Sequence, residues 1–145
     1  MNEDQVERLI YIYLQRWGII TRALLEKESF SPPWRELLIQ LRKMELRGVL
    51  RGGRFIAGLG GEQFSLPETV DAIRKFKKAR ESAPKNKLYC LSAADPLNLM
   101  NLTSGSQKLP RLQKNRVLYQ GGIPIAVLGS GRVKPVSYTH LRAHE

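Results

Sequence analysis

The 145-residue sequence has few of the side chains from which catalytic and metal sites are built. Its single cysteine, Cys90, excludes an internal disulfide and a multi-cysteine zinc site. Both histidines, His140 and His144, lie at the extreme end of the chain. A GxxxxGK[ST] phosphate loop is absent, which excludes an ATP site of that kind. We therefore expect no catalytic residue, no bound cofactor and no metal site in this chain.

Acidic residues are scarce in the second half, where Asp95 is the only one between Glu81 and Glu145. Because Asp95 precedes a proline, we interpret it as a turn-former. The alternative is a lone general base, as a DNA glycosylase could use on a flipped base. Cys90 lies in the apolar stretch KLYCLSA, which favours a buried thiol and, by default, a reducing cytoplasmic compartment.

Long apolar runs are also missing, since none approaches the ~20 residues that a membrane span needs. The polar start MNEDQVERL is not a secretory signal, so we expect a cytoplasmic protein with no membrane partner. Positive charge is abundant: 24 Lys and Arg oppose 13 Asp and Glu, a net charge of +11. This excess favours a polyanionic partner such as DNA, and the alternative is a generally basic solvated surface.

The first half has the order of a winged helix-turn-helix. Apolar spacing predicts helices over residues 4–17 and 21–28, the second capped by Thr21. A third helix is expected from a Ser31 cap to Gly48, with an apolar stripe that runs from Trp34 to Met44. Two short β runs, 49–51 and 54–56, flank Gly-Gly and predict a hairpin, the wing, with Arg51 and Arg54 near its tip. A strand near 63–66 and a helix over 68–80 complete a predicted domain spanning residues 1–82.

The third helix and the wing carry the candidate DNA-binding residues. A recognition helix enters the major groove, while cations on the wing touch phosphates. Ile39 and Leu46 also face outward, and Glu36 interrupts the basic face, so a solvated surface and packing on another domain remain alternatives. The run RKFKKAR, residues 74–80, either follows phosphates or is a solvated helix end. The predicted DNA-binding set is Arg35, Arg42, Lys43, Arg47, Arg51 and Arg54.

Short strands and turns dominate residues 83–136, after a polar linker, ESAPKNK. Strands are expected over 88–91, 115–119, 123–128 and 132–136, with the middle two joined through Gly121-Gly122. This pattern predicts part of a small β-barrel-like domain. The fold class is therefore α+β, a winged helix followed by a partial β domain.

Three strings resemble, in the same order, the C-terminal region of the bacterial large helicase-related (Lhr) family. They are PPWRELLIQLRKMELRGVLRGGRFIAGLGGEQFSLPE, LSAADPLNL and NRVLYQGGIPIAVL. The resemblance implies a parent that is an ATP-dependent superfamily 2 DNA helicase linked to DNA repair. ATP and Mg would then bind the parent's motor domains, which would also be partners of this chain. Some long forms of the family are associated with glycosylase activity on uracil-containing DNA.

Residues 137–145 depart from the family pattern and resemble translated adaptor sequence, so we expect a non-native tail. Three functions follow from the sequence. The first is a DNA-binding accessory module of a helicase, and the second is part of a glycosylase-like repair domain. The third is a module that packs on other domains without DNA contact. Full solvation of Ile39 and Leu46, or a continuous positive face, would weaken this third hypothesis.

Overall fold

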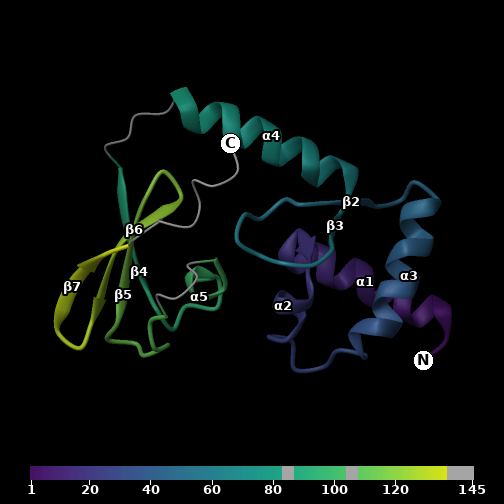
Figure 1. Cartoon of the computed structure of the whole chain (residues 1–145), viewed down its shortest axis with the longest axis horizontal. Coiled ribbons are helices and arrows are strands. Elements are labelled where there is room, and N and C mark those ends of the chain that lie inside the picture. Colours follow the sequence, from purple (N-terminus) through teal and green to yellow (C-terminus); the bar gives the residue numbers. More distant parts are fainter. Residues whose placement is uncertain (83–86, 104–107, 137–145) are drawn as a thin grey trace. The chain divides into compact units, whose positions relative to one another are not determined.

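The computed structural model describes residues 1–82, 87–103 and 108–136 (Figure 1). The predicted tail, 137–145, and both histidines lie outside the described residues. Backbone contacts divide the chain into two units, each described here by itself. The first comprises Met1–Phe55 and Gly60–Lys78, and the second comprises Ile56–Leu59 and the chain from Ala79 onward. Among the described residues, no helix combines the length and apolarity needed to cross a bilayer.

The first unit is built from helices around a small antiparallel sheet, and the predicted helices are confirmed. The helices are α1 (Glu3–Trp17), α2 (Arg22–Leu25), α3 (Trp34–Leu46) and the part of α4 (Pro67–Ser82) up to Lys78. The strands β1 (Ile19–Ile20), β2 (Arg51–Gly53) and β3 (Gln63–Ser65) pair in the order β1-β3-β2. Strand β1 was not predicted, because two apolar residues between helices are too few to show the alternation that marks a strand.

Local capping explains where the first helices begin and end. The Asn2 side chain accepts the backbone N–H of Gln5, whose own side chain accepts the Asn2 N–H, completing a capping box. Gly18 ends α1 with φ of 74°. The hydroxyl of Thr21 accepts the N–H of Leu24 at 3.2 Å, which confirms Thr21 as the cap of α2.

The predicted cap of α3 was wrong. Pro33, not Ser31, is the N-cap residue, and no side chain caps the helix. The Ser31 hydroxyl instead donates to the carbonyl oxygen of Pro32 at 3.1 Å. Two consecutive prolines hold the chain extended before the helix, so the serine side chain does not reach the first-turn N–H groups.

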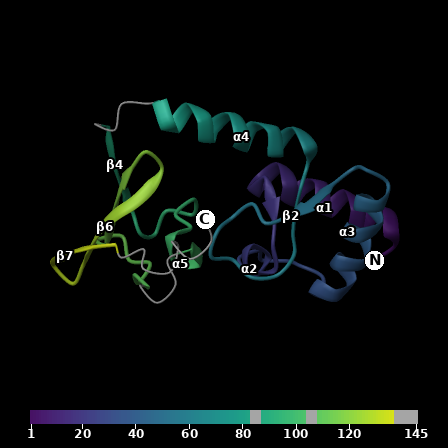
Figure 2. The ribbon, with the colours of Figure 1, turned by 45° about the horizontal axis from the view of Figure 1, so that its top comes forward.

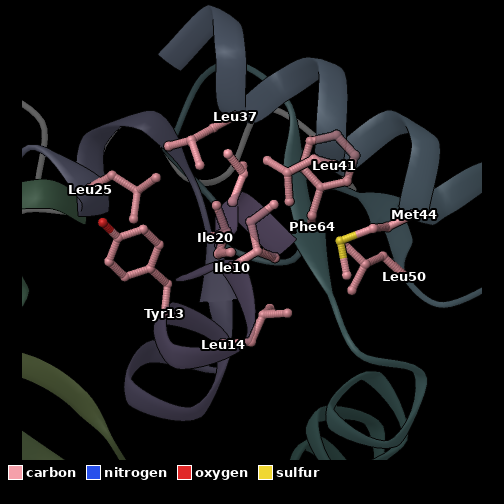
Figure 3. Packing of buried hydrophobic residues seen from close by; sticks show 11 residues of the cluster. Ile10, Tyr13, Leu14, Ile20, Leu25, Leu37, Leu41, Met44, Leu50 and Phe64 are labelled. Atoms are coloured by element: carbon pink, nitrogen blue, oxygen red, sulfur yellow. The ribbon is translucent and has the colours of Figure 1, made fainter. Parts of the chain in front are cut away.

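The core of the first unit joins α1, α3 and the sheet (Figure 3). Leu37, Leu41 and Met44 of α3 are fully buried, as the predicted stripe requires. They pack with α1 and with Phe64 of β3, which is 1% exposed. Burying each large apolar side chain contributes about 1.5–3 kcal/mol, so this stripe determines which face of α3 points outward.

The predicted Gly52-Gly53 turn was also wrong. Both glycines lie within β2, where Gly52 pairs with Phe64 and Gly53 with Gln63. The run 54–56 is not a strand, and β2 is connected to β3 by residues 54–62, which we call the wing loop. The loop start is fixed by the buried Gln63 side chain, which accepts the N–H of Phe55 at 2.8 Å.

The second unit contains an open four-stranded antiparallel sheet in the order β4-β5-β6-β7 (Figures 1 and 2). Its elements are β4 (Leu88–Ser92), α5 (Met100–Thr103), β5 (Arg116–Gln120), β6 (Ile123–Gly129) and β7 (Arg132–Pro135). The predicted strands are confirmed, including the hairpin through Gly121-Gly122. Within the described ranges the sheet does not close, so the barrel-like part of the prediction is not confirmed.

Two expectations for isolated side chains in this unit had different outcomes. The Asp95 carboxylate accepts the N–H of Leu97 at 2.8 Å, which confirms its role in a turn. Cys90 is exposed, so the expected buried thiol was wrong. It lies on the edge strand β4, where apolar Leu88 and Leu91 are exposed as well. An apolar string alone did not reveal that the described residues of the second unit leave this strand exposed.

Candidate nucleic-acid interface

The face of α3 that points away from the core carries a mixed row of side chains. Arg35, Ile39, Arg42 and Leu46 recur at i, i+4, i+7 and i+11, and we call them the outward stripe. All four are exposed, with Ile39 at 55% and Leu46 at 88%. Positive charge on this face is therefore interrupted by two large apolar groups.

Three of the six predicted cations are already paired with carboxylates of the first unit. Arg42 makes a two-point contact with Glu62 at the end of the wing loop, through its Nη2 and through its Nε at 3.2 Å. Lys43 Nζ lies 2.6 Å from Glu3 Oε1, and Arg47 Nη2 lies 2.7 Å from Glu7 Oε2. These pairs tie α3 to the wing on one flank and to α1 on the other.

The pKa values respond to these pairs as expected for exposed partners. The hydrogen bond and charge of Lys43 lower the pKa of the Glu3 carboxyl below its ordinary value. The hydrogen bond and charge of Glu62 raise the pKa of Arg42. Because these ion pairs are exposed, solvent screens them, and a phosphate can compete for the cation.

Glu7 is the centre of a small polar cluster between α1 and α3. Its Oε2 accepts from Gln40 Nε2 at 3.0 Å and from Arg47. Gln40 is 6% exposed, so this hydrogen bond satisfies a buried amide. Arg47 is thereby held toward α1, away from the wing side of α3.

The other three predicted cations form no ion pair with any carboxylate in the part of the chain that the structure describes. They are Arg35, Arg51 and Arg54, and all are exposed. Arg35 lies in the first turn of α3, Arg51 opens β2 opposite Ser65, and Arg54 begins the wing loop. Arg51 is therefore at the base of the wing, not at its tip as the predicted turn required.

A contact from α3 holds the base of the wing in place. Glu45 Oε1 accepts the backbone N–H of Gly52 at 3.0 Å. A Cβ built on Gly52 would collide with the same oxygen, which is the flexible end of the Glu45 side chain, so a larger residue here would displace Glu45 from this contact. The contact links the end of the candidate recognition helix to the strand that carries Arg51.

Comparison with known proteins agrees with this architecture. Residues 1–85 match the family described as large helicase-related protein, winged-helix domain. The chain belongs to this family. It is 34% identical over 99 residues to the "Lhr helicase/uracil glycosylase" of Escherichia coli (strain K12), covering 66% of this chain and 6% of that protein. It is 30% identical over 88 residues to the "Lhr helicase/ probable uracil glycosylase" of Mycolicibacterium smegmatis, covering 60% and 6%.

These matches confirm the resemblance to the Lhr family that the sequence motifs indicated. The chain spans only 6% of the length of the two relatives, so their helicase and glycosylase names describe much larger proteins. Of the six predicted cations on this winged helix, three form ion pairs with carboxylates, and the other three form none among the described residues. Sequence reasoning missed the pairing acids because Glu3 and Glu7 lie 40 residues from their partners, where no local pattern connects them.

Proposed function

We propose that this chain is a DNA-binding accessory module of an Lhr helicase, which holds DNA mainly through phosphate contacts. The observation that carries the proposal is the exposure of Arg51 and Arg54 on the wing of a family-assigned winged helix. No described carboxylate pairs with either side chain. Arginine on a wing is placed for phosphates, which hold the protein on DNA without reading sequence.

The composition of α3 supports weak sequence preference. Specific readout needs polar side chains aimed at base edges, and arginine or lysine on guanine is the commonest case. In the outward stripe, Ile39 and Leu46 alternate with the arginines, and Arg42 is held by Glu62. Of that stripe, Arg35 remains as the cation available to the groove or to a phosphate beside it.

The outward apolar groups also bear on the packing-module alternative. Ile39 and Leu46 are exposed within this chain, which counts against a role in packing on its own described parts. The positive face is not continuous, which counts in favour of a neighbour there. We assign the DNA contact to the wing and to Arg35, and leave Ile39 and Leu46 out of it.

We propose that, in the parent helicase, this DNA contact supports an ATP-dependent motor that acts in DNA repair in the cytoplasm. ATP and Mg would be bound by motor domains elsewhere in that protein, because this chain has no phosphate loop. The module would then contribute affinity for DNA, while the chemistry and translocation take place on other domains.

The test measures, by fluorescence anisotropy, how tightly the 145-residue chain binds a labelled DNA duplex at a series of salt concentrations. Arg51→Ala with Arg54→Ala should weaken binding and reduce the slope of log K against log salt by about 1.8, since each lost phosphate contact removes ~0.9. Lys114→Ala with Arg132→Ala, two exposed cations of the second unit, is the charge-matched control. The proposal would be refuted by a DNA affinity that does not change with salt concentration, or by a wing variant that binds as tightly as the parent chain.

Glycosylase activity is a second candidate for the parent, favoured by the names of the two relatives. In this chain the Asp95 carboxylate is used to hold a turn, so we do not assign it to catalysis. Incubating the full-length protein with uracil-containing DNA tests the activity. Asp95→Asn should leave any base release intact, because asparagine supports the same turn.

A further inference from the structure

Two acids of α1 hold two of the six predicted cations. Lys43 Nζ lies 2.6 Å from Glu3 Oε1, and Arg47 Nη2 lies 2.7 Å from Glu7 Oε2. The two acids are spaced i, i+4, as are the two cations, so the acids share one face of α1 and the cations share one side of α3. Figures 1 and 2 both show the first turns of α1 beside α3. We call these two ion pairs the acid clamp.

The two acids of the clamp are fixed to different degrees. The Glu7 side chain is 25% exposed, and its Oε2 also accepts from Gln40 Nε2 at 3.0 Å. Because Gln40 is buried, its amide needs this acceptor and orients the carboxylate in the absence of any ligand. The Glu3 side chain is 72% exposed, so its bond from Lys43 is a surface contact. Glu7 is therefore a preorganised partner for Arg47, and Glu3 is a weaker partner for Lys43.

An open hollow between α1 and α3 contains the clamp. Its volume is about 370 Å³, and its charged lining consists of Glu3, Asp4, Glu7, Lys43 and Arg47. Three carboxylates therefore oppose two cations, which gives this lining a net charge of −1. A phosphate that approached either cation would have to displace a carboxylate, and it would meet a further one at Asp4. The hollow as a whole therefore repels a polyanion.

The wing side of α3 has the opposite balance of charge. Arg42, Arg51 and Arg54 lie there with two carboxylates, Glu45 and Glu62, which gives a net charge of +1. Glu62 bonds Arg42, and Glu45 accepts a backbone N–H of β2. In the part of the chain that the structure describes, neither acid pairs with the other two arginines. A polyanion near α3 is therefore attracted to the wing side and repelled from the α1 side.

We infer that Glu3 and Glu7 are specificity-determining residues that confine a bound DNA duplex to the wing side of α3. They compete with phosphates for Lys43 and Arg47, so these two cations make no DNA contact although the sequence places them on the candidate recognition helix. The inference rests on the proposed function, because it states where the DNA contact of the wing ends. It adds that two acids of α1, which touch no DNA themselves, set that limit.

The experiment measures duplex binding by the 145-residue chain, by fluorescence anisotropy over a salt series. Glu3→Gln with Glu7→Gln frees both cations and should strengthen binding roughly fivefold to tenfold at low salt. The slope of log K against log salt should steepen by about 1.8, since each phosphate gained adds ~0.9. Glutamine keeps an acceptor for Gln40, so the fold is retained, which tryptophan-monitored urea unfolding checks. Glu7→Gln alone should give most of the gain, because Glu7 is the preorganised acid.

A second variant keeps the net charge of the parent chain. It combines Glu3→Gln and Glu7→Gln with Lys43→Gln and Arg47→Gln, so two acids and two cations are lost together. If the clamped cations touch no DNA, this variant should bind the duplex with the affinity and salt slope of the parent chain. A folded variant that binds fivefold more weakly, or worse, would show that Lys43 and Arg47 contact DNA in the parent chain and would overturn the inference.

A charge-matched control separates release of the cations from net charge. Glu36→Gln with Glu68→Gln removes two exposed acids of the same unit that form no ion pair among the described residues. This control should gain less than about twofold in affinity and leave the salt slope unchanged. An equal gain in the control and in the Glu3→Gln, Glu7→Gln variant would overturn the inference alone. Failure of the wing variant to lose affinity would overturn the proposed function and this inference together.

Discussion

Two Gly-Gly pairs in this chain look alike in sequence and differ in structure. Gly121 and Gly122 form the turn of the β5–β6 hairpin, with φ of 56° and 79°. Gly52 and Gly53 lie inside β2 and do not appear among the positive-φ glycines of the described chain. The same dipeptide therefore makes a turn in one unit and a strand in the other.

The flanking residues account for the difference. The strands on either side of Gly121-Gly122 pair directly and bury Val117 and Val127. A tight hairpin at this position therefore brings two core residues together. After Gly52-Gly53, it is Phe64, and not Phe55, that reaches the helical core. Pairing β2 with β3 places Phe64 inside, at the cost of a longer loop, and loop length costs little free energy. A Gly-Gly pair permits a turn, and burial decides whether one forms.

The largest predicted effect tests that role of Phe64. Phe64→Ala should lower the free energy of unfolding of the first unit by about 3–5 kcal/mol, because it leaves a cavity in the core. Both tryptophans, Trp17 and Trp34, lie in this unit, so urea unfolding followed by tryptophan fluorescence measures it selectively. Phe76→Ala, at an exposed position, is the control and should change stability by less than about 0.5 kcal/mol. Similar losses in both variants would contradict the explanation.

The next effect compares the glycines directly. Gly122→Ala should destabilise the second unit by about 1–2 kcal/mol, since an L-residue must adopt a left-handed conformation there. Gly53→Ala should cost the first unit less, because the backbone there is that of a strand and the added Cβ, 3.0 Å from the Phe55 ring, requires only a shift of that side chain. Amide hydrogen exchange in β5 and β6, beside tryptophan-monitored unfolding, measures each unit. Equal costs at the two sites, also with Phe55→Leu to remove the contact with its ring, would contradict the strand conformation of Gly53.

A smaller effect concerns DNA binding by the wing side of α3. Glu62→Gln should release Arg42 and increase duplex affinity roughly threefold at low salt, by adding one phosphate contact. Glu36→Gln removes the same charge from an exposed position of α3 and serves as the control. If both variants raise affinity equally, the gain comes from net charge and the pairing of Arg42 is irrelevant to binding.

The smallest effect is a pH dependence of the second unit. Burial, and then the charge of Asp95, raise the pKa of the Tyr119 phenol, whose hydroxyl donates to Asn98 Oδ1 at 2.7 Å. The neutral phenol is thus favoured in the folded state, so its contribution is complete below the ordinary tyrosine pKa and is lost as pH rises through the raised value. Tyr119→Phe should flatten this alkaline loss in β5 and β6 amide spectra. A variant with the same alkaline profile as the parent chain would contradict this account.

The periodicity of apolar residues, together with capping and turn residues, was enough to predict much of the fold. The α3 stripe gave the helix and its inward face, Gly18 and Thr21 marked the ends of α1 and α2, and strands β4 to β7 followed from alternation and turns. The family was indicated by motif order. These are properties of neighbouring residues, so a local pattern contains them.

The candidate site was predicted less completely. The six cations are exposed as expected, but the sequence did not show that Glu3, Glu7 and Glu62 hold three of them. It placed Arg51 near the tip of the wing, whereas Arg51 lies at its base, in β2. Each of these facts depends on which distant segment lies beside α3 or β2, and a helical wheel drawn for one helix contains no information about its neighbours.

By itself, the sequence determined the helices, the outward stripe, the net charge of +11 and the family. Only the tertiary structure decided which cations remain free, where the wing turns and whether Cys90 is covered. The physical reason is the range of the interactions involved. Capping, turn chemistry and periodic burial act within a few residues, whereas ion pairing and strand partnership depend on segments far apart in the chain.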